Sequence, residues 1–265
     1  DEAAPADEAC FLAQQQSISQ RAEGLRERIA DLDNREREED FPFRKGREDH
    51  TALSAEIDSL QRRKSNIDAA QVRIRDGLCA ALSISEDELP FAGELIQVRD
   101  DERDWEGAAE RLLRGFGLAL LVPDANYKAV ADWVDRQHLG ARLVYFHVRP
   151  RKSAQGAGLL PQSLVRKLVI KPDSPHYEWL EQELRQRFDV ACCDTGEQFR
   201  REARAITRSG QIKDPSGRHE KDDRSRIDDR GRYVLGWSNA DKLRALRDQR
   251  ERLEEKLATL GQRIG

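Results

Sequence analysis

The spacing of apolar residues changes three times between residues 101 and 149, and this restricts the possible fold more than any other feature of the chain. A helical spacing from Trp105 to Leu113 gives way to the continuous apolar run 118–122, then returns, and ends in a second run at 143–148. Apolar runs that alternate with amphipathic helices are typical of strands and helices in α/β layers. The stretch therefore predicts the core of a small α/β domain.

Both flanks of this domain carry a heptad repeat, which predicts coiled-coil helices. A chain that leaves a compact insert beside its point of entry brings its two flanking helices together antiparallel, so we expect 240–265 to lie along about 55–82. The apolar seam positions of the N-terminal flank are Ala22, Leu25, Ile29, Leu32, Leu53, Ile57, Leu60, Ile67, Ile74, Leu78 and Ala81, and those of the C-terminal flank are Leu243, Leu246, Leu253, Leu257, Leu260 and Ile264, with Arg250 the one polar residue among them.

The sequence FPFRKG at 41–46 interrupts the N-terminal heptads. Pro42 removes a helical hydrogen bond and disfavours a helical residue before it. We therefore expect two helices, about 8–40 and 48–82, with a break or fold-back between them. Polar or small residues also occupy four seam positions around this point, namely Glu36, Glu39, Gly46 and His50.

The predicted organisation is an N-terminal arm at 1–85 with a break near 41–46, an α/β domain at 86–238 and a C-terminal arm at 239–265. The predicted fold class is thus α/β, with a small α/β domain inserted between antiparallel coiled-coil arms, and its sheet should be largely parallel. Within the domain we expect strands at 94–99, 118–122, 142–148 and 190–193, an apolar segment at 164–170, helices at 105–114, 126–139, 177–188 and 197–207, and a polar, turn-rich stretch at 209–232.

Composition excludes several classes of protein. Apolar residues make up 38% and charged residues 36% of the chain, which is thin for one large core. The net charge of -4 argues against a dedicated polyanion-binding domain. No apolar run of about 18 residues and no signal peptide is present, so we expect a cytoplasmic protein without a membrane span. The absence of methionine suggests a piece of a longer protein or a processed initiator.

No motif for a cofactor or metal is found. The four cysteines match neither a disulfide framework nor a zinc site, and no phosphate-binding P-loop occurs, so we expect no cofactor, no metal and no catalytic residue. Two glycine pairs would permit tight turns or close approach of backbones between subunits. They make Gly115, Gly117, Gly156 and Gly158 candidates for a dimer interface.

Two charged clusters remain open to more than one interpretation. The acidic cluster at 219–229 could hold a divalent metal for phosphodiester hydrolysis, but interleaved arginines favour salt-bridge networks. Its members are His219, Glu220, Asp222, Asp223, Asp228 and Asp229. Basic residues could instead contact DNA phosphates, the last four of them from one helix face. These DNA-contact candidates are Arg149, Arg151, Lys152, Arg200, Arg201, Arg204 and Arg208.

Longer motifs point to a family. The runs LPFAGELIQVRDDERDWEGAAERLLRGFGLALLVPDANY, HLGARLVYFHV and RHEKDDRSRIDDRGRYVLGW resemble the hinge region of the MukB-like ATPase subunit of Wadjet plasmid-defence systems, JetC, and of its MksB relatives. The resemblance covers roughly 86–240, and YVLGW is its most specific part. Two long arms around an α/β insert are likewise the arrangement of hinges in SMC-type chromosome-organising ATPases.

The resemblance implies a hinge through which two copies form a homodimer, in a DNA loop-extruding ATPase that acts in chromosome organisation or plasmid restriction. Implied partners of the parent protein are kleisin, accessory and Toprim-like nuclease subunits, and the implied location is the nucleoid. No ATPase motif lies in this chain, so the chain itself should not be an enzyme. The alternatives are a metal-dependent nuclease or phosphoesterase on a coiled-coil stalk, which would use 219–229, and a coiled-coil adaptor without a DNA connection.

Overall fold

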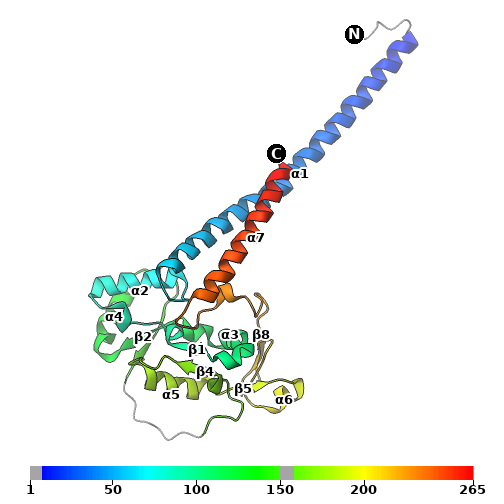
Figure 1. Ribbon diagram of the computed structural model, residues 1–265. Coiled ribbons are helices and arrows are strands. Elements are labelled where there is room, and N and C mark those ends of the chain that lie inside the picture. Colours follow the sequence, from blue (N-terminus) through cyan, green and yellow to red (C-terminus); the bar gives the residue numbers. More distant parts are fainter. Residues whose placement is uncertain (1–7, 150–157, 265) are drawn as a thin grey trace. The chain divides into compact units, whose positions relative to one another are not determined.

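The computed structural model describes residues 8–149 and 158–264. The chain forms two compact units, Asp1–Ser54 with Gln249–Gly265 (unit 1) and Ala55–Asp248 (unit 2). Two long helices, α1 (Glu8–Arg62) and α7 (Ala240–Ile264), contribute to both units. An α/β domain is inserted in the sequence between them, as predicted (Figure 1).

In unit 1, α1 and α7 lie side by side and run in opposite directions (Figure 1). His50 Nε2 is 2.8 Å from Glu254 Oε1. A Cβ atom placed on Gly46 would lie 2.8 Å from Leu257 Cδ2, so the leucine fills the space that glycine leaves. Residue numbers rise along α1 while they fall along α7, which confirms the antiparallel pairing. The predicted register is wrong, because 249–261 lies along about 43–53 instead of along 55–82.

The predicted break near 41–46 is absent, because α1 is one continuous helix with Pro42 inside it. Proline in a helix costs about 3 kcal/mol, but packing against a neighbouring helix supplies most helical stability in proteins. Pro42 is exposed, whereas Gly46 and His50 face α7 and have partners there. Gly46 and His50 therefore belong to the interface between the two helices and do not interrupt it. The side chains of Glu36 and Glu39 lie outside the described part of the structure.

The second predicted helix, 48–82, is divided between two helices. α1 ends at Arg62, and a separate helix, α2 (Ala69–Leu82), follows it. Ile67 and Leu78 are fully buried in the core of unit 2. The predicted arm boundary at 85 is therefore corrected to about 62. The heptad spacing misled here because a helix that packs on a domain core places its apolar residues at the same intervals.

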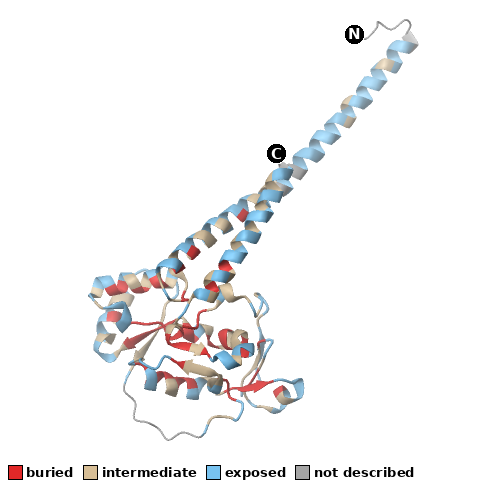
Figure 2. Cartoon of the chain, in the orientation of Figure 1, coloured by how far each residue is buried: buried red, intermediate tan, exposed pale blue. Residues whose placement is uncertain are grey.

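The strand–helix–strand unit predicted from 101–149 is present. The strands β2 (Ala119–Pro123) and β3 (Val144–Val148) pair in parallel, as is usual when a helix connects two strands. That helix is α4 (Asp124–Arg136), and α3 (Glu106–Gly117) precedes β2. Buried residues concentrate on these elements of unit 2, whereas the N-terminal part of α1 is mostly exposed (Figure 2).

The prediction of one largely parallel sheet is wrong, since the strands form three small sheets. β1 (Ile96–Val98) pairs antiparallel with β4 (Leu168–Ile170). A four-stranded sheet follows the order β5 (Ala191–Cys193), β6 (Ala205–Thr207), β7 (Gln211–Lys213), β8 (His219–Lys221), and only its first pair is parallel. Short connections of this kind favour antiparallel neighbours.

The last two predicted helices differ in outcome. The helix at 177–188 is confirmed as α5 (Tyr177–Phe188). The helix at 197–207 is too long: α6 covers only Gly196–Arg201, and 205–207 forms β6 instead. Short 3-10 helices occupy Glu86–Glu88, Ala92–Leu95, Asp100–Trp105, Leu164–Lys167 and Arg230–Arg232.

Candidate functional site

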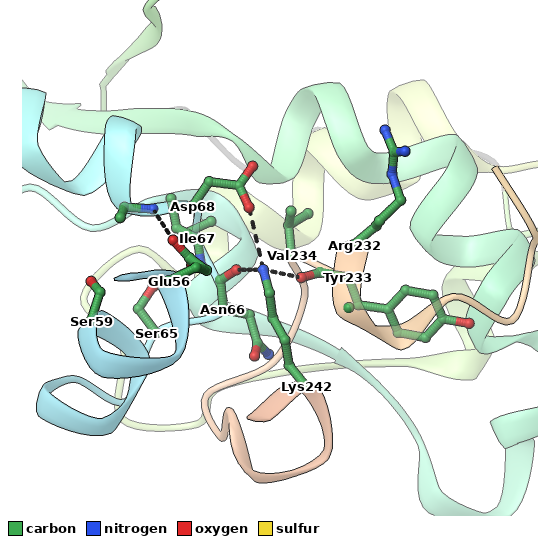
Figure 3. Close-up of polar contacts among 12 residues, drawn as sticks. Glu56, Ser59, Ser65, Asn66, Ile67, Asp68, Arg232, Tyr233, Val234 and Lys242 are labelled. Atoms are coloured by element: carbon green, nitrogen blue, oxygen red, sulfur yellow. Dashed lines mark hydrogen bonds and ion pairs between the residues drawn. The ribbon is translucent and has the colours of Figure 1, made fainter. Parts of the chain in front are cut away.

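Two segments of unit 2 that are far apart in the sequence are held together by a buried polar network. One segment leads out of α1 at 62–69, and the other leads into α7 at 233–242 (Figure 3). They are the stretches through which the chain enters and leaves the α/β domain. Four side chains, which we call the latch, connect them to each other and to α3: Asn66, Glu110, Asn239 and Lys242.

Lys242 lies at the centre of the latch and is only 3% exposed. Its Nζ donates to the backbone oxygens of Asn66 at 2.6 Å and Tyr233 at 3.1 Å, and lies 3.3 Å from Asp68 Oδ1 (Figure 3). Burial lowers the pKa of this ammonium group, and the Asp68 carboxylate opposes the effect. All three donor positions of the ammonium are thus used, as burial of a charge requires.

The two asparagines complete the connection. Asn66 Nδ2 donates to the backbone oxygens of Leu235 at 2.7 Å and Ser238 at 3.0 Å. Asn239 Nδ2 reaches the other way and donates to the backbone oxygens of Leu60 at 2.7 Å and Arg63 at 2.6 Å. Each segment therefore donates side-chain hydrogen bonds to the backbone of the other.

Glu110 binds the exit segment, 233–242, to α3. Its carboxylate accepts hydrogen bonds from the backbone N–H groups of Val234 at 2.9 Å and Leu235 at 2.8 Å. Burial raises the pKa of Glu110 to about 7, and the two backbone hydrogen bonds oppose the rise. The sequence YVLGW, which carried the most specific resemblance, thus supplies the backbone that the latch holds.

The arrangement can hold the entry and exit of the domain at a fixed separation. The hydrogen-bond acceptors of the latch are mostly backbone oxygens, and the Asn66 Oδ1 atom is buried without a hydrogen-bond partner among the described residues. Sequence reasoning missed all four latch residues. The one available signal was the placement of two asparagines and a lysine beside the ends of apolar heptads, where solvated residues are common.

The glycine candidates for a dimer interface separate into three cases. Gly117 is buried, and a Cβ atom there would lie 3.1 Å from side-chain atoms of both Val234 and Leu235. This close approach is within the chain, which argues against a subunit contact at Gly117. Gly115 is exposed, and a Cβ atom at Gly115 or Gly158 would meet nothing within 4 Å. Gly156 lies outside the described residues.

The predicted face of four arginines on one helix is not formed, because the helix ends at Arg201. Arg204 donates to the backbone oxygen of Arg187 at 3.1 Å, near the end of α5. Arg208 lies 2.8 Å from both Asp104 and Asp194.

The other DNA-contact candidates stand apart from one another. Arg201 pairs with Glu197, one turn earlier on α6. Arg200 is exposed, and no ion pair is recorded for it among the described residues. Arg149, at the end of β3, is exposed and lies 3.7 Å from Asp124. Arg151 and Lys152 lie outside the described residues.

The acidic cluster at 219–229 is neutralised by its own basic neighbours. Asp222 is bound by Arg224 through two contacts of 2.9 and 2.7 Å, which hold its pKa well below the usual range. Asp228 is bound in the same way by Arg226, at 3.0 and 2.8 Å. The interleaved charges thus form local salt bridges. Within 8–149 and 158–264, no group of three or more potential metal ligands is present.

Three of the cysteines are buried thiols. Burial raises the pKa of Cys192 to about 12 and also raises the pKa values of Cys79 and Cys193. These thiols are therefore poor nucleophiles at neutral pH.

Comparison with known proteins gives a likeness of structure only. No protein-family model matches the chain, and no curated protein matches it. The chain is similar to the folded elbow of cohesin, with 15% identity and a TM-score of 0.46 over 95% of this chain and 36% of that one. The present chain therefore spans about a third of that protein's length.

Two hinge structures are also similar. A Pyrococcus furiosus Smc hinge domain with an extended coiled coil shares 18% identity and a TM-score of 0.41, over 93% of this chain and 89% of that one. The Geobacillus stearothermophilus SMC hinge domain, solved as an asymmetric dimer, shares 13% identity and a TM-score of 0.44, over 89% and 96%. These identities and scores are too low to assign the chain to a family. In the described residues, no helix is long and apolar enough to span a membrane.

Proposed function

We propose that the chain is the dimerisation hinge, with adjoining coiled-coil arms, of an SMC-like ATPase. The observation that carries the proposal is the latch, which joins the entry and exit segments of a domain inserted between two antiparallel helices. A domain of this kind brings two distant parts of a long chain together at one point. The motifs that resemble the JetC hinge region, and the arrangement of arms that resembles SMC-type hinges, support the same assignment.

Sedimentation of the full chain tests the proposal. At micromolar concentration we expect a homodimer with twice the chain mass of 30.3 kDa. Two-fold dimers are the commonest assemblies of soluble chains. A monomer at every concentration up to tens of micromolar would contradict the proposal.

Association through α1 is the competing cause of a dimer. Leu25 and Leu32 are 62% and 59% exposed. The double variant Leu25→Asp, Leu32→Asp places two charges in the exposed apolar stripe, which also includes Ile18 and Ile29, and leaves unit 2 unchanged. A hinge dimer keeps its mass in this variant, whereas a dimer formed through α1 becomes monomeric. The control is Ser17→Asp with Gln20→Asp, which adds two acidic residues at exposed positions of the same helix outside the stripe.

The finer identity proposed for the parent protein is a MukB-like subunit of a Wadjet system, JetC, that extrudes DNA loops in the cytoplasm and associates with the nucleoid. Kleisin, accessory and Toprim-like nuclease subunits are its proposed partners. The chain itself is proposed to be without ATPase or nuclease activity. ATP turnover that survives stringent purification would contradict this, as would DNA cleavage lost on Asp222→Ala with Asp223→Ala.

Contact with DNA is a separate part of the proposal, and it rests on the exposed residues Arg149 and Arg200. Binding should be independent of sequence and weaken with salt, and each lost phosphate contact should flatten the log–log slope by about 0.9 for duplex DNA. The variant Arg149→Glu, Arg200→Glu should flatten the slope, and Lys128→Glu, exposed on α4, serves as control. Unchanged affinity in the double variant would remove both residues from the interface.

A further inference from the structure

Within the described residues, no strand pairs with the outer edge of β4, where the Leu168 N–H group donates to the backbone oxygen of Val165. The other edge, beyond β1, is occupied, because the N–H group of Gly236 donates to the backbone oxygen of Ile96 at 2.7 Å. On β4, Val169 is opposite Gln97, so Leu168 and Ile170 direct their backbone groups away from β1. No hydrogen bond is recorded in the described residues for the Ile170 N–H group on that edge. Unpaired strand edges are ready sites for another extended chain.

A groove runs along this outer edge, between β4 and α5. Its lining is mainly apolar and includes Leu159, Val165, Leu168, Pro172, Tyr177 and Leu184. Tyr177 is 40% exposed and is the one large apolar side chain of unit 2 recorded as exposed in the described part of the chain. An edge strand beside an apolar groove is the arrangement that binds peptides by strand addition, with backbone bonds for affinity and side-chain pockets for specificity.

The charges around the groove indicate what kind of chain would fit. Glu181 is the one carboxylate in its lining, and it lies 3.3 Å from Arg185. Lys171 and Arg166 are exposed at the two ends of β4 and form no ion pair within the described residues, and the Arg166 guanidinium donates to the backbone oxygens of Leu160 at 2.9 Å and Leu159 at 3.3 Å. An occupant with acidic residues at its ends would complement these cations.

A second copy of the chain fits this edge poorly. Antiparallel pairing of two β4 strands about Val169 would place Lys167 of one copy opposite Lys171 of the other. Lys167 is paired with Glu102 at 2.7 Å, so Lys171 is the uncompensated charge of each such pair, and an acidic residue opposite Lys171 is more favourable than a lysine. The groove therefore favours a partner of different sequence.

We propose that the groove between β4 and α5 binds an extended, acid-flanked segment of a partner protein as a third strand on β4. The side chains of the segment alternate, so that every second one is apolar and enters the groove. This surface is distinct from the latch and does not depend on dimerisation, so the proposal goes beyond the function proposed above.

Fluorescence anisotropy with the full chain tests the proposal. The probe is a labelled peptide, Asp-Glu-Val-Thr-Val-Thr-Val-Glu-Asp, and the comparison peptide replaces its four acidic residues with lysine. We expect the acidic peptide to bind at least tenfold more tightly. Absence of binding by the acidic peptide up to millimolar concentration, or equal binding of the two peptides, would overturn the proposal.

Methylation of the peptide backbone tests strand addition itself. Every second N–H group of an added strand bonds to β4, so N-methylation of one alternate set should weaken binding at least tenfold, and methylation of the other set should have little effect. Equal effects of the two sets would exclude strand addition.

Protein variants locate the binding site. Tyr177→Glu should weaken binding of the acidic peptide at least tenfold, whereas Phe41→Glu, at an exposed aromatic of α1, should not change it. Lys171→Glu with Arg166→Glu should reverse the preference towards the lysine-flanked peptide. If Tyr177→Glu instead dissociates the chain's own dimer and leaves peptide binding unchanged, a second copy occupies the groove and the proposal is wrong. Sedimentation of the unsubstituted chain tests the hinge proposal independently of peptide binding.

Discussion

At the scale of single residues, Lys242 has the largest predicted effect on stability. Its ammonium group satisfies the backbone oxygens of Asn66 and Tyr233 inside the latch. Lys242→Met removes the charge, keeps much of the side-chain volume and leaves these oxygens unpaired. We expect a loss of about 2–4 kcal/mol in the free energy of unfolding, measured by urea titration.

Lys256→Met is the matched control for this substitution, since Lys256 is an exposed lysine of the same helix. Its effect should stay within about 0.5 kcal/mol. Equal effects of the two substitutions would mean that the latch lysine contributes nothing beyond an ordinary surface residue.

Glu110 gives the chain a specific dependence of stability on pH. Burial raises the pKa of Glu110 from its ordinary value of 4.5 to about 7, so the folded chain holds a proton that the unfolded chain releases between these pH values. Stability should therefore fall as pH rises from about 4.5 to 7, by up to about 3 kcal/mol from this residue. Lys242 and Arg114 are the nearby cations that oppose the rise in pKa.

Urea titrations at several pH values measure this dependence. Glu110→Gln cannot titrate, so its free energy of unfolding should not show the decrease that Glu110 causes between about pH 4.5 and 7. It should also be less stable overall, because an amide nitrogen would face a backbone N–H group. Glu255→Gln, at an exposed position of α7, should keep the pH profile of the parent chain. If the stability of the unsubstituted chain and of Glu110→Gln changed with pH in parallel, the raised pKa of Glu110 would be contradicted.

At the scale of elements, the pairing of α1 with α7 depends on the absence of a side chain at Gly46. Gly46→Leu would press against Leu257 and should destabilise unit 1 by about 1–3 kcal/mol. Gly24 provides the contrast, because a Cβ atom there meets nothing within 4 Å. Gly24→Leu should be neutral or stabilise by up to about 1 kcal/mol through helix propensity. Thermal unfolding followed by circular dichroism compares the two, and equal melting temperatures would refute the close contact.

Continuity of α1 through Pro42 is measurable within unit 1. Spin labels at Ala30 and Thr51 on one continuous helix should be separated by about 32 Å along the axis, at about 1.5 Å per residue. A fold-back at 41–46 would bring the labels much closer. A distance distribution centred well below the helical value would restore the break that the sequence suggested.

The elements show what sequence patterns can and cannot predict. Apolar spacing predicted the β2–α4–β3 unit and the two long helices, because burial of one face imposes those periods directly, and the insertion of a domain between the helices predicted their antiparallel direction. It failed at β6, where the helical spacing of arginines says little about burial. Ala205 and Ile206 are fully buried between β5 and β7, and that pairing depends on residues elsewhere in the chain. The latch could not be predicted, since backbone oxygens leave no signature in the sequence.

At the scale of the whole molecule, the boundary of the α/β domain decides which shortened chain can fold. A chain of residues 84–240, cut at the boundaries that the heptads suggest, would lose α2 and with it the fully buried Ile67 and Leu78. We expect it to lack a cooperative thermal transition. A chain of residues 55–248 keeps the latch and the core and should unfold cooperatively. Cooperative unfolding of the shorter chain would show that α2 is dispensable for the domain.

The acceptors of the latch have a consequence for the evolution of such chains. Leu60, Arg63 and Tyr233 contribute backbone oxygens, which every amino acid possesses. Substitutions at these positions leave the bonds available wherever the backbone keeps its path. The hydrogen bonds of the junction therefore depend on four side chains only, while apolar neighbours such as Leu60 and Val234 are held by burial in the core. Two chains of this kind could differ at many exposed positions and still join their arms in the same way.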